Sequence, residues 1–156
     1  MWCRNSIITG CLVLALTVVV QAQNKKPAVV LPESAAQQIT RPCSRPGPPK
    51  FEGTWLPTDA DVQAMESRLM RISRLRSKGG IRGARIQHPD RYYRQYLGII
   101  VGKRKMIYVN ALCVDEPPSF WRERPVIACD GGSCFWGVVY DIVTGKFSHL
   151  ELNGVA

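Results

Sequence analysis

Several motifs that define common enzyme classes are missing from this sequence of 156 residues. It contains no Gly-x-Ser-x-Gly nucleophile elbow, no His-Glu-x-x-His zinc motif, no phosphate-binding loop and no dinucleotide fingerprint. Histidine is scarce, with two residues, and the sequence has 12 acidic residues against 21 basic ones. There is no internal repeat, and the composition is not that of a disordered chain. The sequence therefore predicts one domain without a recognisable catalytic signature.

An apolar run is confined to the N-terminus. Arg4 precedes the apolar residues 7–20, and Val20-Gln21-Ala22 places small residues three and one positions before a cleavage site. This pattern is typical of a secretory signal peptide, and the run is too short for a good membrane span. Cleavage after Ala22 gives residues 1–22 as signal peptide and a mature chain that starts at Gln23. We therefore expect an exported protein, periplasmic or secreted, with no transmembrane span in its mature form.

Four cysteines remain after cleavage: Cys43, Cys113, Cys129 and Cys134. An even number in an exported chain predicts two disulfides and no free thiol. We favour Cys113–Cys129 with Cys43–Cys134, because Cys113 and Cys129 flank the one long loop. The competing expectation is Cys129–Cys134 with Cys43–Cys113. A metal site is not expected, since Cys129 and Cys134 have no further ligands at matching spacing.

Residues 23–50 carry six prolines, at positions 27, 32, 42, 46, 48 and 49. Proline at this density opposes regular structure and favours extended chain, so we expect an extended arm before a domain that spans residues 51–156. A disulfide at Cys43 would tie this arm to the domain.

The pattern of the domain is that of an α+β fold. Thr58 is a good helix N-cap, and an apolar stripe predicts a helix over residues 59–78 that ends at Gly79-Gly80: Val62, Met65, Leu69 and Ile72. Alternating segments then predict strands over residues 92–101, 105–112, 135–142 and 147–152. We expect one N-terminal amphipathic helix packed on a roughly four-stranded antiparallel meander, stapled by disulfides. This element order is similar to that of cystatin-like and nuclear-transport-factor-like folds.

The positive charge is concentrated in residues 68–94, which hold nine basic residues and one acid, Asp90. Arginine predominates there, and its guanidinium fork matches phosphate and carboxylate groups. We expect a binding face formed by Arg68, Arg71, Arg74, Arg82, Arg85, Arg91, Arg94 and Tyr93. The alternative is a solvated helix face followed by a flexible basic loop.

The only candidate catalytic residues are His88, His149 and Asp130, which together would suit a phosphodiesterase-like reaction. Nothing in their spacing requires them to meet. The segment 129–134, Cys-Asp-Gly-Gly-Ser-Cys, is typical of a tight turn, with a recognition loop as the alternative.

The leading hypothesis is a small non-enzymatic binding module, such as an inhibitor or an envelope-associated factor. It would bind an anionic macromolecule or surface: an acidic protein, an anionic polymer or lipid headgroups. No cofactor is expected, and no specific nucleic-acid motif is present. Two alternatives are a small hydrolase that uses His88 and His149, and a purely structural envelope domain.

Processing of the leader is directly measurable. The intact mass of the exported protein should correspond to a chain that begins at Gln23, because the residues before it fit signal peptidase. A mass that retains residues 1–22 would indicate an uncleaved anchor. A mass that carries lipid on Cys11 would instead show that Ile8-Thr9-Gly10-Cys11 acts as a lipobox.

Overall fold

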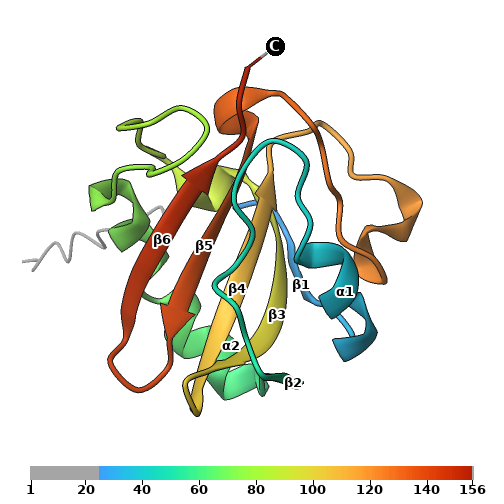
Figure 1. Ribbon diagram of the computed structural model, residues 1–156, viewed down its shortest axis with the longest axis vertical. Coiled ribbons are helices and arrows are strands. Elements are labelled where there is room, and N and C mark those ends of the chain that lie inside the picture. The colour runs from blue at the N-terminus through green and yellow to red at the C-terminus, as the bar shows by residue number, and fades with distance from the viewer. Residues whose placement is uncertain (1–24, 156) are drawn as a thin grey trace, which may run out of the picture.

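The computed structural model describes residues 25–155 (Figure 1). The expected leader, its cleavage site and the lipidation candidate Cys11 lie outside these residues. Within residues 25–155 no helix is both long and apolar enough to cross a membrane. The described chain forms an α+β fold with two disulfides, as expected.

The sheet is mixed and has six strands instead of four antiparallel ones. Its order is β1-β3-β4-β5-β6, and β2 also pairs with β3. The strands are β1 (Ala28–Val30), β2 (Gly53–Trp55), β3 (Tyr93–Val101), β4 (Arg104–Leu112), β5 (Phe135–Asp141) and β6 (Lys146–Leu152). Strands β1 and β2 were not expected because each has three residues, too few to show an alternating pattern.

The last four strands have bounds within one residue of those expected, and tight turns connect the two hairpins. Gly102 and Lys103 join β3 to β4, and both have positive φ, as this type of two-residue turn requires. The turn between β5 and β6 ends at Gly145, with φ 65°. The side chain of Asp141 accepts hydrogen bonds from the backbone N–H groups of Val143 and Thr144, and these bonds stabilise the turn.

The expected helix over residues 59–78 is shorter and consists of two pieces. Thr58 is the N-cap of helix α2 (Asp59–Glu66) and forms a complete capping box with Asp61. The hydrogen bond from the Thr58 side chain lowers the pKa of Asp61. A 3-10 helix, η2 (Leu69–Arg74), follows. The side chains of Ser67 and Arg68 both donate to the carbonyl of Ala64, and such local bonds compete with a continuous helix.

The apolar stripe is buried despite this break. Met65, Leu69 and Ile72 pack on one face of the sheet against side chains that include Val109 and Trp136. A kinked pair of short helices therefore buries the side chains that the sequence placed on one long helix.

Residues 25–50 differ from the expected extended arm, because they cover the other face of the sheet. Strand β1 pairs with β3, and a short helix, α1 (Ala36–Ile39), follows (Figure 1). Leu31, Ala35 and Ile39 are buried together with residues of β3, β4 and β5. Aliphatic residues follow the first two prolines, and burial of Leu31, Ala35 and Ile39 outweighs the preference for extended chain.

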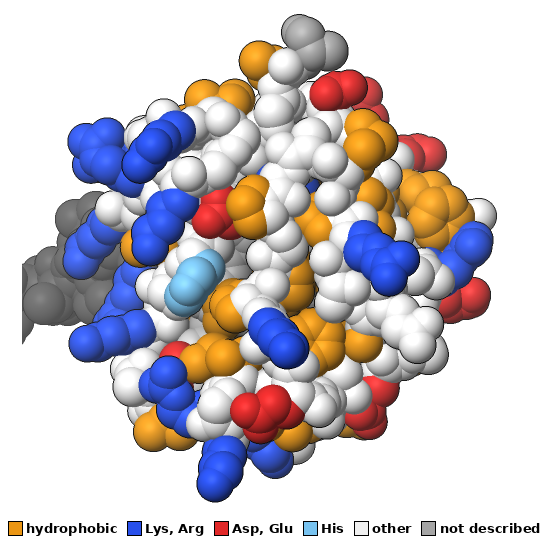
Figure 2. All heavy atoms as spheres, in the orientation of Figure 1, with side chains coloured by type: hydrophobic (Ala, Val, Ile, Leu, Met, Phe, Trp, Pro, Cys, Tyr) orange, Lys and Arg blue, Asp and Glu red, His pale blue; other side chains and the backbone are white. Residues whose placement is uncertain are grey.

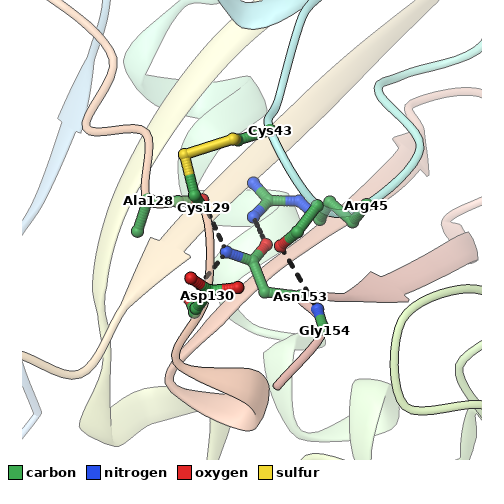
Figure 3. Close-up of a disulfide and its surroundings, with 8 residues drawn as sticks. Cys43, Arg45, Ala128, Cys129, Asp130, Asn153 and Gly154 are labelled. Carbon is green, nitrogen blue, oxygen red and sulfur yellow. Dashed lines mark hydrogen bonds between the residues drawn. A yellow bond between two sulfur atoms is a disulfide. The ribbon is translucent and has the colours of Figure 1, made fainter. Parts of the chain in front are cut away.

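The rest of this face is polar. Arg45 donates to Asn110 over 2.6 Å and also to Asn153, and Asn110 donates to Gln95 over 2.8 Å. Asn153 in turn donates to the carbonyls of Ala128 and Asp130 (Figure 3). All four side chains of this network are buried, so their mutual hydrogen bonds replace those with water.

Both expected disulfide pairings are wrong. The disulfides are Cys43–Cys129 and Cys113–Cys134 (Figure 3 shows the first). Leu112 of β4 pairs with Phe135 of β5, so the cysteines just beyond these residues come within 4.9 Å between Cα atoms. The segment that contains Cys43 belongs to the N-terminal layer on the sheet, and its Cys43 bonds to Cys129. The pairing depends on strand register, which loop lengths alone do not reveal.

Adjacent residues on η2 allow the core to be tested against the surface. Leu69 is 2% exposed and Met70 is 50% exposed. Leu69→Ala should lower the free energy of unfolding by about 2–5 kcal/mol, because it leaves a cavity between η2 and the sheet. Met70→Ala should change it by less than about 0.5 kcal/mol. Urea denaturation measures both, and equal effects would contradict this packing.

Candidate functional site

Seven exposed basic side chains follow one another between residues 71 and 91. With Lys146 they form what we call the basic band: Arg71, Arg74, Arg76, Lys78, Arg82, Arg85, Arg91 and Lys146. Figure 2 shows basic side chains along the left of the view, where Figure 1 places η2 and the following loop in green. Three ion pairs occur within residues 25–155, and none involves the band. Its charges are therefore not neutralised by the described part of the chain.

Local structure holds the band in place. Element η2 contacts both β6 and a further 3-10 helix, η3 (Pro89–Arg91). The loop between η2 and η3 folds back on itself, since Ser77 and Ala84 share a backbone hydrogen bond. The backbone N–H of Lys78 donates to Leu150 of β6 over 3.1 Å and attaches this loop to the sheet edge. The basic side chains are thus carried by anchored backbone.

Two surface grooves lie along the band. The first, the η2 groove, has a volume of about 410 Å³ and is lined by Arg71, Arg74, Leu75, Gly145, Lys146 and Phe147. Three cationic side chains surround it. Lys146 comes from β6, far from the other two in sequence, and only the packing of η2 on β6 brings them together. No sequence signal identified Lys146 as part of this site.

The second, the η3 groove, has a volume of about 350 Å³ and is lined by Arg85, Ile86, Gln87, His88, Arg91, Tyr92, Cys113 and Ser133. The Tyr92 hydroxyl donates to the Ser133 carbonyl over 3.1 Å, which closes one side of the groove. Burial raises the pKa of Tyr92, so this side chain adds no negative charge to the groove. The groove combines two guanidinium groups with the polar side chains of Gln87, His88 and Ser133.

Arg94, expected on the binding face, is instead buried, with an exposed fraction of 1%. Its Nε atom lies 3.1 Å from Glu66 Oε1 and 2.9 Å from the Tyr96 hydroxyl, and its Nη2 atom donates to the Lys26 carbonyl. Alternation along β3 turns positions 94 and 96 toward α2. The strand pattern itself was the signal, because it puts Arg94 on the same face as buried Tyr96.

Arg68 and Tyr93 also have partners within the fold. Arg68 is half-buried and donates to the Tyr140 hydroxyl over 2.8 Å. Tyr93 is half-buried, donates to the Asp115 carbonyl over 3.1 Å and lies edge-on to Trp121. Both side chains join elements of the domain to one another. Of the eight residues expected on the binding face, Arg71, Arg74, Arg82, Arg85 and Arg91 are exposed.

The three candidate catalytic residues are not joined by any hydrogen bond within residues 25–155. His88 lines the η3 groove, whereas exposed His149 bonds to Ser148 Oγ at 3.0 Å in β6. The side chain of Asp130 makes no contact with either histidine through a hydrogen bond, and its backbone carbonyl accepts from Asn153. Across the described residues, no three His, Cys, Asp or Glu side chains are arranged to hold a metal ion.

The segment 129–134 is a turn packed against the rest of the domain. Gly131 and Gly132 have φ values of 92° and 52°, and the N–H of Gly132 donates to the carbonyl of Gly154. Gly132 is buried beside Ile81 and Val155. These contacts fit the expected structural role of the two glycines.

Replacement of Arg94 separates structural from surface arginines. Arg94→Ala should lower the free energy of unfolding by about 3–5 kcal/mol, because it removes a buried guanidinium that pairs with Glu66 and donates to several backbone carbonyls. Arg91→Ala, three residues away and exposed, should change it by less than about 0.5 kcal/mol. Thermal or urea unfolding gives both values. Similar stabilities for the two variants would show that Arg94 is not part of the core.

No family model, curated protein or solved structure matches this chain. The candidate site is defined by its own geometry: a basic band on anchored backbone, with a groove toward each end.

Proposed function

We propose that this protein is an exported, non-enzymatic module that binds an anionic macromolecule through the basic band. The observation that carries the proposal is that eight exposed cations lie along η2, its following loop, η3 and β6 without an ion-pair partner in residues 25–155. Cations that served only the fold would be expected to have partners, as Arg94 has in Glu66.

Clustered charge of one sign has a physical consequence for binding. Unpaired basic side chains sum to a positive potential that attracts anions and raises their local concentration. A polyanion that binds them releases its condensed counterions, which favours association at low salt. Arginine adds geometric selectivity, since its fork donates two parallel hydrogen bonds to a sulfate, phosphate or carboxylate group.

Two disulfides are compatible with an exported protein, because disulfides persist mainly in oxidising compartments. In such a compartment the module would act as an inhibitor or an envelope-associated factor. Within residues 25–155 no hydrogen bond joins His88 to His149, so the hydrolase alternative gains no support from the position of these side chains. The purely structural alternative is separated from the proposal by a binding measurement.

Charge reversal on η2 tests the proposal. Without the leader the chain has 20 basic and 12 acidic residues, a net charge of +8, and Arg71→Glu with Arg74→Glu lowers it to +4. This variant should bind immobilised heparin at least about tenfold more weakly, a change of about 1.4 kcal/mol. The dependence of its log affinity on log salt should also be shallower.

The matched control is Arg41→Glu with Lys50→Glu, which gives the same net charge at two exposed positions outside the band. It should retain most of the affinity and the steep salt dependence. Both variants should keep the unfolding midpoint of the parent, since neither changes a buried side chain. If the η2 variant binds heparin, duplex DNA and anionic vesicles as the parent does, the basic band is only a solvated surface.

A further inference from the structure

We infer that the ligand of the basic band is an extended anionic polysaccharide whose charged groups occupy the η2 groove and the η3 groove at the same time. This inference rests on the proposed function and narrows it to one class of ligand and one mode of binding.

The two grooves lie toward opposite ends of the sheet. Gly145, Lys146 and Phe147, at the turn between β5 and β6, line the η2 groove. Cys113, which follows β4, and Ser133, which lies shortly before β5, line the η3 groove. They lie at the end of these strands that is away from the β5–β6 turn. Strand β5 between these ends has seven residues, so the grooves are separated by about 20 Å along the strand direction at about 3.3 Å per residue.

Neighbouring elements carry the arginines that line the two grooves. Element η2 packs between β6 and η3, which places Arg74 and Arg91 on neighbouring elements. A compact anion would fill one groove and leave the cations of the other without a counter-charge. A chain with anionic groups along its length would contact both, and the second contact would form at a high effective concentration.

Side-chain chemistry in the η3 groove favours a sugar. Gln87, His88 and Ser133 lie beside Arg85 and Arg91. Amide, imidazole and hydroxyl groups form hydrogen bonds with sugar hydroxyls, whereas the guanidinium groups bind sulfate or carboxylate. A charged polysaccharide carries both kinds of group on each short stretch of chain.

Single-stranded nucleic acid fits less well, because its binding depends on aromatic side chains on which bases stack. The large hydrophobic side chains exposed in residues 25–155 include no aromatic one: Leu56, Met70, Ile127, Val143 and Val155. Tyr92, the aromatic residue of the η3 groove, is half-buried and lies edge-on to Trp136. A membrane surface fits less well too, since Met70 is the only one of these apolar side chains on η2 and lipid insertion needs a broad apolar face.

The test uses heparin oligosaccharides fractionated by length, from the disaccharide upward, with affinities measured by calorimetry at fixed salt. Affinity of the parent should rise by about 100-fold as the fragments become long enough to span about 20 Å, because the second groove then binds the same molecule. Fragments longer than this should increase the affinity little further.

Two charge reversals isolate the grooves. Arg71→Glu with Arg74→Glu changes the η2 groove, and Arg85→Glu with Arg91→Glu changes the η3 groove. Each variant should bind short fragments through the intact groove within about threefold of the parent and should lose the gain with length. Arg41→Glu with Lys50→Glu should keep that gain. All variants should show the circular dichroism spectrum of the parent.

The outcomes distinguish this inference from the proposed function. If short and long fragments bind the parent equally well and charge reversal weakens both, the two-groove mode is wrong and the proposed function stands. If heparin fragments fail to bind but duplex DNA or phosphatidylglycerol vesicles bind through the band, the polysaccharide assignment is wrong. If none of these probes binds, the proposed function fails as well.

Discussion

The pairing of β3 on both of its edges is the constraint on which the rest of the structure depends. One edge pairs with β4 along the whole strand, and the other is shared by β1 and β2. Arg94 and Tyr96 face α2. On the other side, Leu97 packs on the N-terminal segment and Gln95 donates to the carbonyls of Trp121 and Arg124. A single strand therefore supplies both faces of the sheet with the side chains that bind their covering layers.

The two faces of the sheet are held by different chemistry. Toward α2 the contacts are mostly apolar, and the one buried cation, Arg94, lies against Glu66. Toward the N-terminal segment, apolar packing gives way to the hydrogen-bonded network of Arg45, Asn110 and Asn153. The cations of the basic band belong to neither arrangement. Most of them lie on η2 and its loop, where the buried side chains are Leu69, Ile72, Ser77 and Ile86.

Alternation and turn residues were sufficient to predict strands β3 to β6, because local sequence fixes which faces are apolar and where the chain reverses. The sequence did not reveal β1, β2 or the disulfide pairing, which depend on contacts between distant segments. In the candidate site, too, some features follow from local sequence and others from contacts between distant segments. The run of exposed arginines was visible in the sequence, whereas the burial of Arg94 and the presence of Lys146 depend on which elements pack together.

The parallel pairing of β1 with β3 also imposes an order on folding. Ala28 pairs with Arg94, and Cys43 bonds to Cys129, 86 residues later in the chain. A chain that emerges N-terminus first must therefore keep Leu31, Ala35 and Ile39 exposed until β3 and β4 have been delivered. Contacts this distant in sequence slow folding, because the intervening chain must be ordered before they form. The N-terminal segment accordingly cannot close on the sheet before β3 and β4 are in place.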